Sequence, residues 1–157
     1  MKKNIKYYLL MAVLIVTVLV QGCSKEEDYK PMPFATYLLS DLTPAGTTTS
    51  NSASGRKTVS KVIARVFVNQ PVDKPVTVTY AYSGTAVQGQ DYNPVTPLTV
   101  TVPASTYYAP IEFTVINNPA LTSNKTVIIT LKSATDGFDL GLGTNKTFKT
   151  YTYTIQP

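Results

Sequence analysis

The side chains with catalytic potential in this sequence are carboxylates, because the usual pairs of nucleophile and base are missing. The 157 residues include one cysteine and no histidine, which rules out Ser-His-Asp and Cys-His arrangements and most zinc sites in this chain. Two carboxylates flanking a cleft could hydrolyse a glycosidic bond. The acids after residue 33 stand mostly beside turn-forming residues: Asp41, Asp73, Asp91, Glu112, Asp136 and Asp139. We therefore predict that the chain is not an enzyme, with a carboxylate-based glycosidase as a remote alternative.

The single cysteine, Cys23, is placed for a different reaction, covalent lipidation. Residues 2–6 contain three lysines, and residues 7–20 are apolar apart from Thr17, as in a secretory signal peptide. This apolar run of 14 residues is shorter than the ~20 residues that a transmembrane helix needs. The segment Val20-Gln21-Gly22-Cys23 resembles the lipobox of bacterial lipoproteins, in which a small residue precedes the cut and the cysteine thiol forms a thioether to diacylglycerol.

This resemblance implies that residues 1–22 are a signal peptide removed after Gly22, and that Cys23 carries three acyl chains, palmitate-type lipid that holds the protein in a membrane. The alternative interpretation of Cys23 is a small buried hydrophobic residue. Residues 23–33 form a lipidated tether, acidic at first and then interrupted by two prolines.

An acidic cluster follows the cysteine directly: Ser24, Lys25, Glu26, Glu27 and Asp28. It resembles the signal by which one large group of Gram-negative bacteria exports lipoproteins to the outer leaflet of the outer membrane. A solvated acidic spacer is the alternative. Ser24 in place of aspartate argues against retention at the inner membrane. The sequence thus predicts a lipid-anchored outer-membrane protein that faces the cell exterior.

The net charge of +5 is misleading, because three of the fourteen basic residues lie in the predicted signal peptide. The mature chain has eleven basic and nine acidic residues, and its basic residues are scattered rather than gathered in a patch. We therefore expect no nucleic-acid partner. No cysteine follows Cys23, so the domain must fold without a disulfide bond.

Strict alternation of apolar and polar residues predicts β-strands, and no helical periodicity is present. Turn-forming residues separate seven such runs, at 34–39, 62–69, 76–82, 98–102, 111–115, 127–132 and 148–155. Seven short strands at this spacing predict an all-β fold, a single antiparallel immunoglobulin-like β-sandwich over residues 34–157. A β-barrel is the alternative. Small polar residues fill 41–58, which predicts a mobile loop.

From about Lys61 to Ile155 the sequence resembles the Calx-beta domain. The most specific match is the turn Gly84-Thr85-Ala86-Val87-Gln88-Gly89-Gln90-Asp91-Tyr92. The residues of this turn also make structural sense by themselves. Gly84 and Gly89 can supply positive φ, Asp91 can accept hydrogen bonds from neighbouring amides, and Tyr92 can bury its ring. We therefore predict a structural role for all four.

Calcium binding is the activity that the Calx-beta resemblance implies, but this sequence departs from the family's acidic pattern. Asn117 and Asn118 stand where the pattern has acidic residues, and Lys125 stands where it has another. Ca²⁺ requires six to eight oxygen ligands, several of them carboxylates. We therefore expect no calcium site, no other metal and no cofactor.

A displayed module without catalytic residues suggests recognition or adhesion, with a glycan or a protein as the extracellular partner. Tyr107 and Tyr108 follow a proline turn, where adjacent rings could stack on a sugar or anchor a protein contact. The alternative function is structural, as a spacer or an assembly subunit of a surface complex, which needs only the fold, the anchor and an open sheet edge.

Overall fold

The computed structural model describes residues 33–41, 50–135 and 137–157. The predicted cleavage site at Gly22, the lipidation site at Cys23 and the export segment 24–28 lie outside these residues, as does Asp136. No helix in the described part of the chain is long and apolar enough to cross a membrane.

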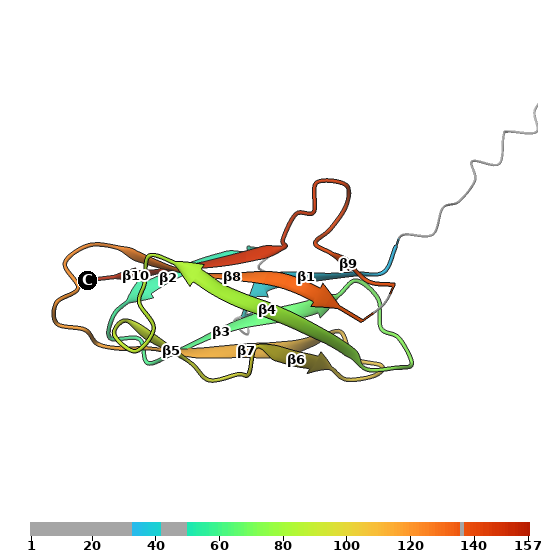
Figure 1. Cartoon of the computed structure of the whole chain (residues 1–157), viewed down its shortest axis with the longest axis horizontal. Helices are drawn as coiled ribbons and strands as arrows, with labels where there is room; N and C mark the ends of the chain where they lie inside the picture. Colours follow the sequence, from blue (N-terminus) through green and yellow to red (C-terminus); the bar gives the residue numbers. More distant parts are fainter. Residues whose placement is uncertain (1–32, 42–49, 136) are drawn as a thin grey trace, which may run out of the picture. The chain divides into compact units, whose positions relative to one another are not determined.

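The first of two sheets contains five strands (Figure 1). In spatial order they are β5 (Tyr92–Pro94), β7 (Tyr108–Val115), β3 (Lys61–Val68), β1 (Ala35–Ser40) and β9 (Asp139–Leu140). β3 pairs with both β1 and β7 in antiparallel register, so it forms the centre of the sheet.

The second sheet also contains five strands. Their order is β2 (Ser52–Arg56), β10 (Thr150–Gln156), β8 (Lys125–Ala134), β4 (Val76–Gly84) and β6 (Thr99–Val102). The β4–β8 pairing shifts register between Thr79 and Tyr80. β2 and β6 are the two edge strands of this sheet.

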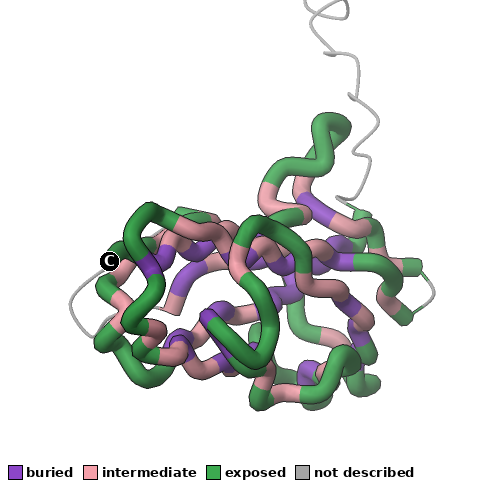
Figure 2. The backbone as a smooth tube through the Cα atoms, turned by 60° about the vertical axis from the view of Figure 1, so that its left-hand side comes forward, coloured by how far each residue is buried: buried purple, intermediate pink, exposed green. Residues whose placement is uncertain are grey.

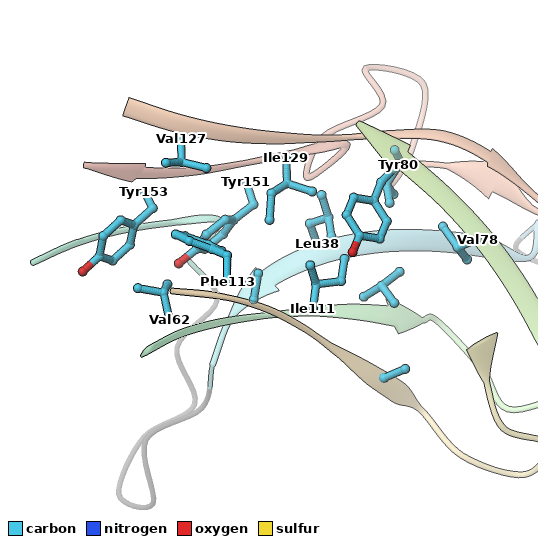
Figure 3. Close-up of a cluster of buried hydrophobic side chains, with 14 of the residues drawn as sticks. Leu38, Val62, Val78, Tyr80, Ile111, Phe113, Val127, Ile129, Tyr151 and Tyr153 are labelled. Carbon is cyan, nitrogen blue, oxygen red and sulfur yellow. The ribbon is translucent and has the colours of Figure 1, made fainter. Parts of the chain in front are cut away.

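The hydrophobic core lies between the sheets, because alternate residues of each strand point inward. Figure 3 shows side chains of both sheets meeting there. Phe113 of β7 is fully buried and packs edge-on against Tyr153 of β10, with ring centroids 5.6 Å apart. Figure 2 shows the complementary pattern, with most exposed residues in the connections. The chain therefore folds as an all-β sandwich, which confirms the predicted fold class over the barrel.

All seven predicted strands are present, and three short strands were missed: β2, β5 and β9. Two of these, β2 and β9, pair in parallel, so the sandwich is not purely antiparallel. The prediction of a mobile loop over 41–58 is wrong for Ser52–Arg56, because these residues form β2. Residues 42–49 of the predicted loop lie outside the described residues. Serine and glycine favour strands weakly. β2 forms because its main chain pairs along β10, from Ser52↔Thr152 to Arg56↔Gln156.

The two ends of the described domain are distinct. At the Pro33 end, β1 begins, β3 ends and β7 begins, since Thr36 pairs with Val68 and Phe67 with Tyr108. At the Pro157 end, β10 ends and β8 begins, and this end also holds the turn from β4 to β5 (Figure 1). These two ends are called the Pro33 end and the Pro157 end below.

Candidate functional site

The turn over residues 84–92 lies at the Pro157 end and depends on its glycines. Gly84 has φ +114° and Gly89 has φ +84°, a region that other residues rarely adopt. A Cβ atom on Gly84 would lie 2.2 Å from the main-chain oxygen of Thr126, whereas one on Gly89 would meet nothing within 4 Å. Two constraints therefore require glycine at position 84: the positive φ and the close approach of β8.

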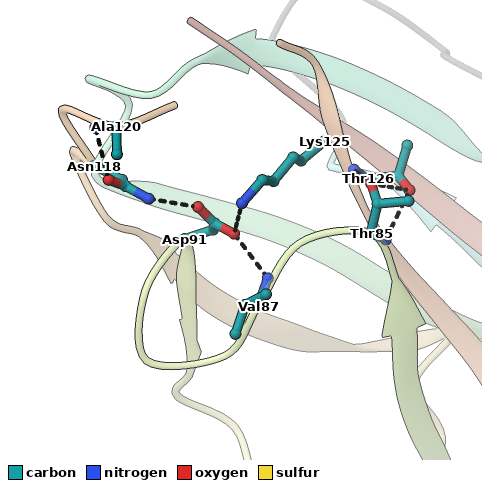
Figure 4. A network of polar contacts seen from close by, with 7 residues as sticks. All are labelled: Thr85, Val87, Asp91, Asn118, Ala120, Lys125 and Thr126. Atoms are coloured by element: carbon teal, nitrogen blue, oxygen red, sulfur yellow. Dashed lines mark hydrogen bonds and ion pairs between the residues drawn. The ribbon is translucent and has the colours of Figure 1, made fainter. Parts of the chain in front are cut away.

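Asp91 accepts three hydrogen bonds inside this turn (Figure 4). Its Oδ2 accepts from the Val87 amide at 2.8 Å and from the Lys125 ammonium at 2.7 Å. Its Oδ1 accepts from the Asn118 side-chain amide at 2.8 Å. The carboxylate is fully buried, so these bonds join the turn to β8 and to the β7–β8 connection. The Tyr92 ring is buried beside it.

Two opposing effects act on the pKa of Asp91. Burial raises it, but the hydrogen bonds from Lys125, Val87 and Asn118 outweigh burial and hold the pKa below its usual value. The carboxylate is therefore ionised, and the Lys125 ammonium balances its charge. A carboxylate that is ionised and held by an ion pair and hydrogen bonds has a structural role and does not suit a general acid.

The residues around Asp91 do not fit a calcium ion. Lys125 places a positive charge on the carboxylate that a cation would need, and Asn118 already donates its amide hydrogen to the other oxygen. The described residues contain no group of three or more His, Cys, Asp or Glu side chains that could hold a metal. Ca²⁺ would lack the converging carboxylates that it requires here.

Tyr107 and Tyr108, the predicted ligand-binding pair, lie at the Pro33 end. Tyr108 is the first residue of β7 rather than part of a turn. The exposed fractions of the two residues are 56% and 42%, so both rings reach the surface. The main-chain oxygen of Tyr107 accepts a hydrogen bond from Val68 of β3, which fixes the position of the pair relative to the sheet.

Tyr108 belongs to a row of three aromatic side chains that crosses β1, β3 and β7. Tyr37 stacks on Phe67 with ring centroids 5.5 Å apart, and Phe67 contacts Tyr108 at 5.3 Å. The Arg65 guanidinium lies 4.4 Å from the centroid of the Tyr108 ring. Because Phe67 and Arg65 both contact the Tyr108 ring, less of that ring is open for stacking against a sugar.

A cavity of about 490 Å³ opens beside the sheet edge formed by β6. We call it the edge pocket, and its lining residues are Ala81, Tyr82, Gln88, Pro94, Val95, Thr96, Pro97 and Leu98. None of them is charged. Val95 and Leu98 are more than half exposed, at 57% and 54%, so aliphatic surface lies open at this pocket, as at protein interaction sites.

Two tyrosines of β4 lie near the edge pocket, and of these only Tyr82 lines it. The Tyr80 hydroxyl donates to the main-chain oxygen of Pro97 at 2.8 Å. The Tyr82 hydroxyl is buried and has no hydrogen-bond partner within the described residues. Burial raises the pKa of Tyr82 well above its usual value. Its phenol is therefore neutral and able to donate a hydrogen bond.

Four of the five side-chain carboxylates in the described residues form ion pairs, and Asp73 does not. Asp41 binds Arg65, Glu112 binds Lys61 and Asp139 binds Lys146 as ion pairs. The edge pocket contains no acid, and a second pocket of about 390 Å³ contains Asp41 alone among its described lining residues. A glycosidase would require two carboxyl groups across one cleft.

The edge pocket is the feature that sequence reasoning missed. Pro94 and Pro97 belong to the turn-forming residues that separate the strands, and two apolar residues, Val95 and Leu98, stand beside them. Exposed apolar residues in a proline-rich connection were the available signal. Their convergence with Tyr82 depends on the β4–β6 pairing, which the sequence pattern does not specify.

No family model and no curated protein matches the chain. Among solved structures it is similar to the apo form of the Calx CBD1 domain, with a TM-score of 0.62 and 15% identity over 79% of this chain and 96% of that chain. The Calx CBD2 domain has a TM-score of 0.55 and 11% identity, over 78% and 85% of the two chains. A two-domain protein of unknown function from Bacteroides fragilis NCTC 9343 has a TM-score of 0.53 and 11% identity, over 85% and 50%. These neighbours establish a Calx-beta-like fold for the described domain.

Proposed function

We propose that this chain is a lipid-anchored recognition module on the outer surface of a bacterium, and that it binds an extended segment of a protein partner at β6 and the edge pocket. The anchor is the acylated Cys23, exposed by cleavage after Gly22, and residues 24–28 direct export. The observation that carries the binding proposal is an uncharged cavity of about 490 Å³ beside an open sheet edge.

The open edge can accept another strand. The Tyr80 amide donates to the Leu98 oxygen, so by antiparallel alternation the main-chain groups of Val100 and Val102 also face β4. Those of Thr99 and Thr101 face away, and the described residues give them no partner on that side. An extended peptide can add to such an edge through main-chain hydrogen bonds, with a nearby pocket selecting one side chain.

The chemistry of the edge pocket favours a protein over a glycan. Its lining is mainly aliphatic and proline, whereas sugar binding needs open aromatic faces and several polar groups. An apolar side chain of a partner strand fits this uncharged cavity.

A glycan at Tyr107 and Tyr108 is the second candidate function, supported by the exposure of both rings. A passive spacer is the third, and it would leave the edge pocket without a partner. The experiments below separate these possibilities from protein binding.

The anchor is tested by labelling growing cells with a palmitate analogue. We expect label on the wild-type chain and none on Cys23→Ser, and we expect protease added to intact cells to digest the domain. Failure to incorporate lipid would overturn the anchor, and protection from protease would overturn outward display.

The binding site is tested by site-specific photocrosslinking on intact cells. A photoreactive residue replacing Leu98 should form a discrete protein adduct, and the same residue replacing Thr152 should not, because Thr152 lies on the outer face of β10, far from β6 in the sheet order. The adduct should disappear when Val95→Asp is added. Equal adducts at both positions, or an adduct that survives Val95→Asp, would contradict the edge pocket as the binding site.

A further inference from the structure

We infer that the Pro33 end of the domain is a membrane-contact surface, in which the exposed rings of Phe34, Tyr107 and Tyr108 lie in the headgroup region of the bilayer. This inference rests on the lipid anchor of the proposed function. It assigns these three residues a lipid partner rather than a glycan.

Hydrogen bonds place the three aromatic residues at one end of the first sheet. Tyr107 accepts from Val68 at 2.9 Å, and the next residue of β3, Asn69, donates its amide hydrogen to the Ala35 oxygen at 3.0 Å. Phe34 is the residue before Ala35. The starts of β7 and β1 are thus held together across the end of β3, so the three residues lie at the same end of the first sheet.

Exposed aromatic and exposed aliphatic side chains are segregated in this domain. The exposed large aromatic residues of the described chain, Phe34, Tyr107 and Tyr108, are all at the Pro33 end. The exposed large aliphatic residues lie in the connections of the Pro157 end and around the edge pocket: Val59, Val87, Val95 and Leu98. The two classes of exposed apolar surface therefore suit different partners.

Aromatic side chains suit the membrane–water interface. Tyrosine combines an apolar ring with a polar hydroxyl, and it is enriched at the level of the lipid headgroups. Phe34 packs against Phe138 with ring centroids 5.2 Å apart, so this contact holds the Phe34 ring in place although the residue is exposed. Half-exposed rings at the end of the domain where the chain continues toward Cys23 suit a shallow contact with lipid headgroups.

The described domain begins at Pro33, so a lipid anchor at Cys23 would bring this end of the domain nearest to the membrane. The Asn69 side-chain amide donates to the Pro33 oxygen at 2.9 Å, which fixes that point beside the aromatic residues. Pro33 follows Cys23 by ten residues, a length that spans ~35 Å when fully extended and roughly 18 Å as a flexible coil. Strands of eight residues, such as β3, carry the Pro157 end about 26 Å further away.

A tryptophan reporter tests this contact directly, because the natural chain contains no tryptophan. The Tyr107→Trp variant of the lipidated chain is purified from membranes and reconstituted into vesicles of phosphatidylethanolamine and phosphatidylglycerol that contain brominated lipid. Val87→Trp is the matched control, since Val87 is similarly exposed, at 45%, but lies in the turn at the Pro157 end. We expect brominated lipid to remove most of the fluorescence of the position-107 reporter and to leave the position-87 reporter unchanged.

The outcomes separate the contact from the anchor. Flotation of the protein with the vesicles tests the anchor, and its loss would overturn the proposed anchor and the contact with it. Flotation without quenching at position 107, or with equal quenching at both positions, would overturn the contact alone. A saturable response of the position-107 reporter to soluble oligosaccharides, without quenching by lipid, would show that the partner of this surface is a glycan and not the membrane.

Discussion

The ammonium of Lys125 lies 2.7 Å from Oδ2 of Asp91, a carboxylate with no exposed surface. The Calx-beta resemblance singles out both positions: Asp91 belongs to the 84–92 turn, and Lys125 is a departure from the family's acidic pattern. The structure gives a physical reason for this departure, because Lys125 supplies the positive charge that balances the buried Asp91 carboxylate.

As the pH falls into the acidic range, the Asp91→Asn variant should lose less unfolding free energy than the wild-type domain. The folded-state pKa of Asp91 lies below its usual value of 3.8, so its contribution is present above that value and is lost as the pH falls through the folded-state pKa. At neutral pH we expect the variant to lose about 1–3 kcal/mol of unfolding free energy, as for a charged hydrogen bond. Urea titrations across acidic pH measure both effects.

The matched control for this prediction is Asp139→Asn. Asp139 pairs with Lys146 at 2.8 Å, but both side chains are about half exposed. Such a surface pair should contribute less than about 1 kcal/mol. An effect as large as that of Asp91→Asn would show that burial is not what distinguishes the two ion pairs.

Calcium should leave the stability of the wild-type domain unchanged. A ligand that binds only the folded state raises the melting temperature, and the stabilisation grows with the logarithm of one plus the ratio of the ligand concentration to Kd. Because Lys125 already occupies Oδ2 of Asp91, we expect the same melting temperature with millimolar Ca²⁺ and with a chelator. A rise that depends on calcium concentration and disappears in Asp91→Asn would reveal a site that the ion pair should exclude.

Gly84→Ala should be far more damaging than Gly89→Ala. Both glycines have positive φ, which costs another residue ~1–2 kcal/mol. Only the new Cβ at position 84 would also meet the main chain of Thr126, at 2.2 Å, so β4 and β8 would have to separate. Equal changes in the free energy of unfolding would mean that φ alone sets the requirement for glycine.

The strands could be predicted from the sequence where an alternating pattern has one buried face. In β10, for example, Tyr151, Tyr153 and Ile155 are buried while the threonines between them are not. The fold follows from such runs, since each must bury its apolar face against another. β2 could not be predicted in this way, because Ser52–Arg56 lacks large apolar residues and depends on β10 for its pairing.

The candidate site could be predicted only in part. The 84–92 turn was recognisable because glycine and aspartate have specific local conformations. The pairing of Asp91 with Lys125, 34 positions later, depends on how β8 enters the sheet, and a linear pattern does not record this. The edge pocket likewise joins β4 to the connection before β6, so its shape is a property of the assembled sandwich.

Tyr80→Phe and Tyr82→Phe should have opposite consequences, although the two tyrosines are neighbours in β4. The Tyr80 hydroxyl donates to the Pro97 oxygen at 2.8 Å, and its removal should cost about 1 kcal/mol and leave a carbonyl without a donor. The Tyr82 hydroxyl is buried without a partner in the described chain, so its removal should be neutral or stabilising in denaturant titrations of the free domain. Because the hydroxyl is buried, Tyr82→Phe should also leave the Leu98 crosslink unchanged. A loss of stability in Tyr82→Phe as large as that in Tyr80→Phe would show that the hydroxyl has a hydrogen-bond partner within the domain.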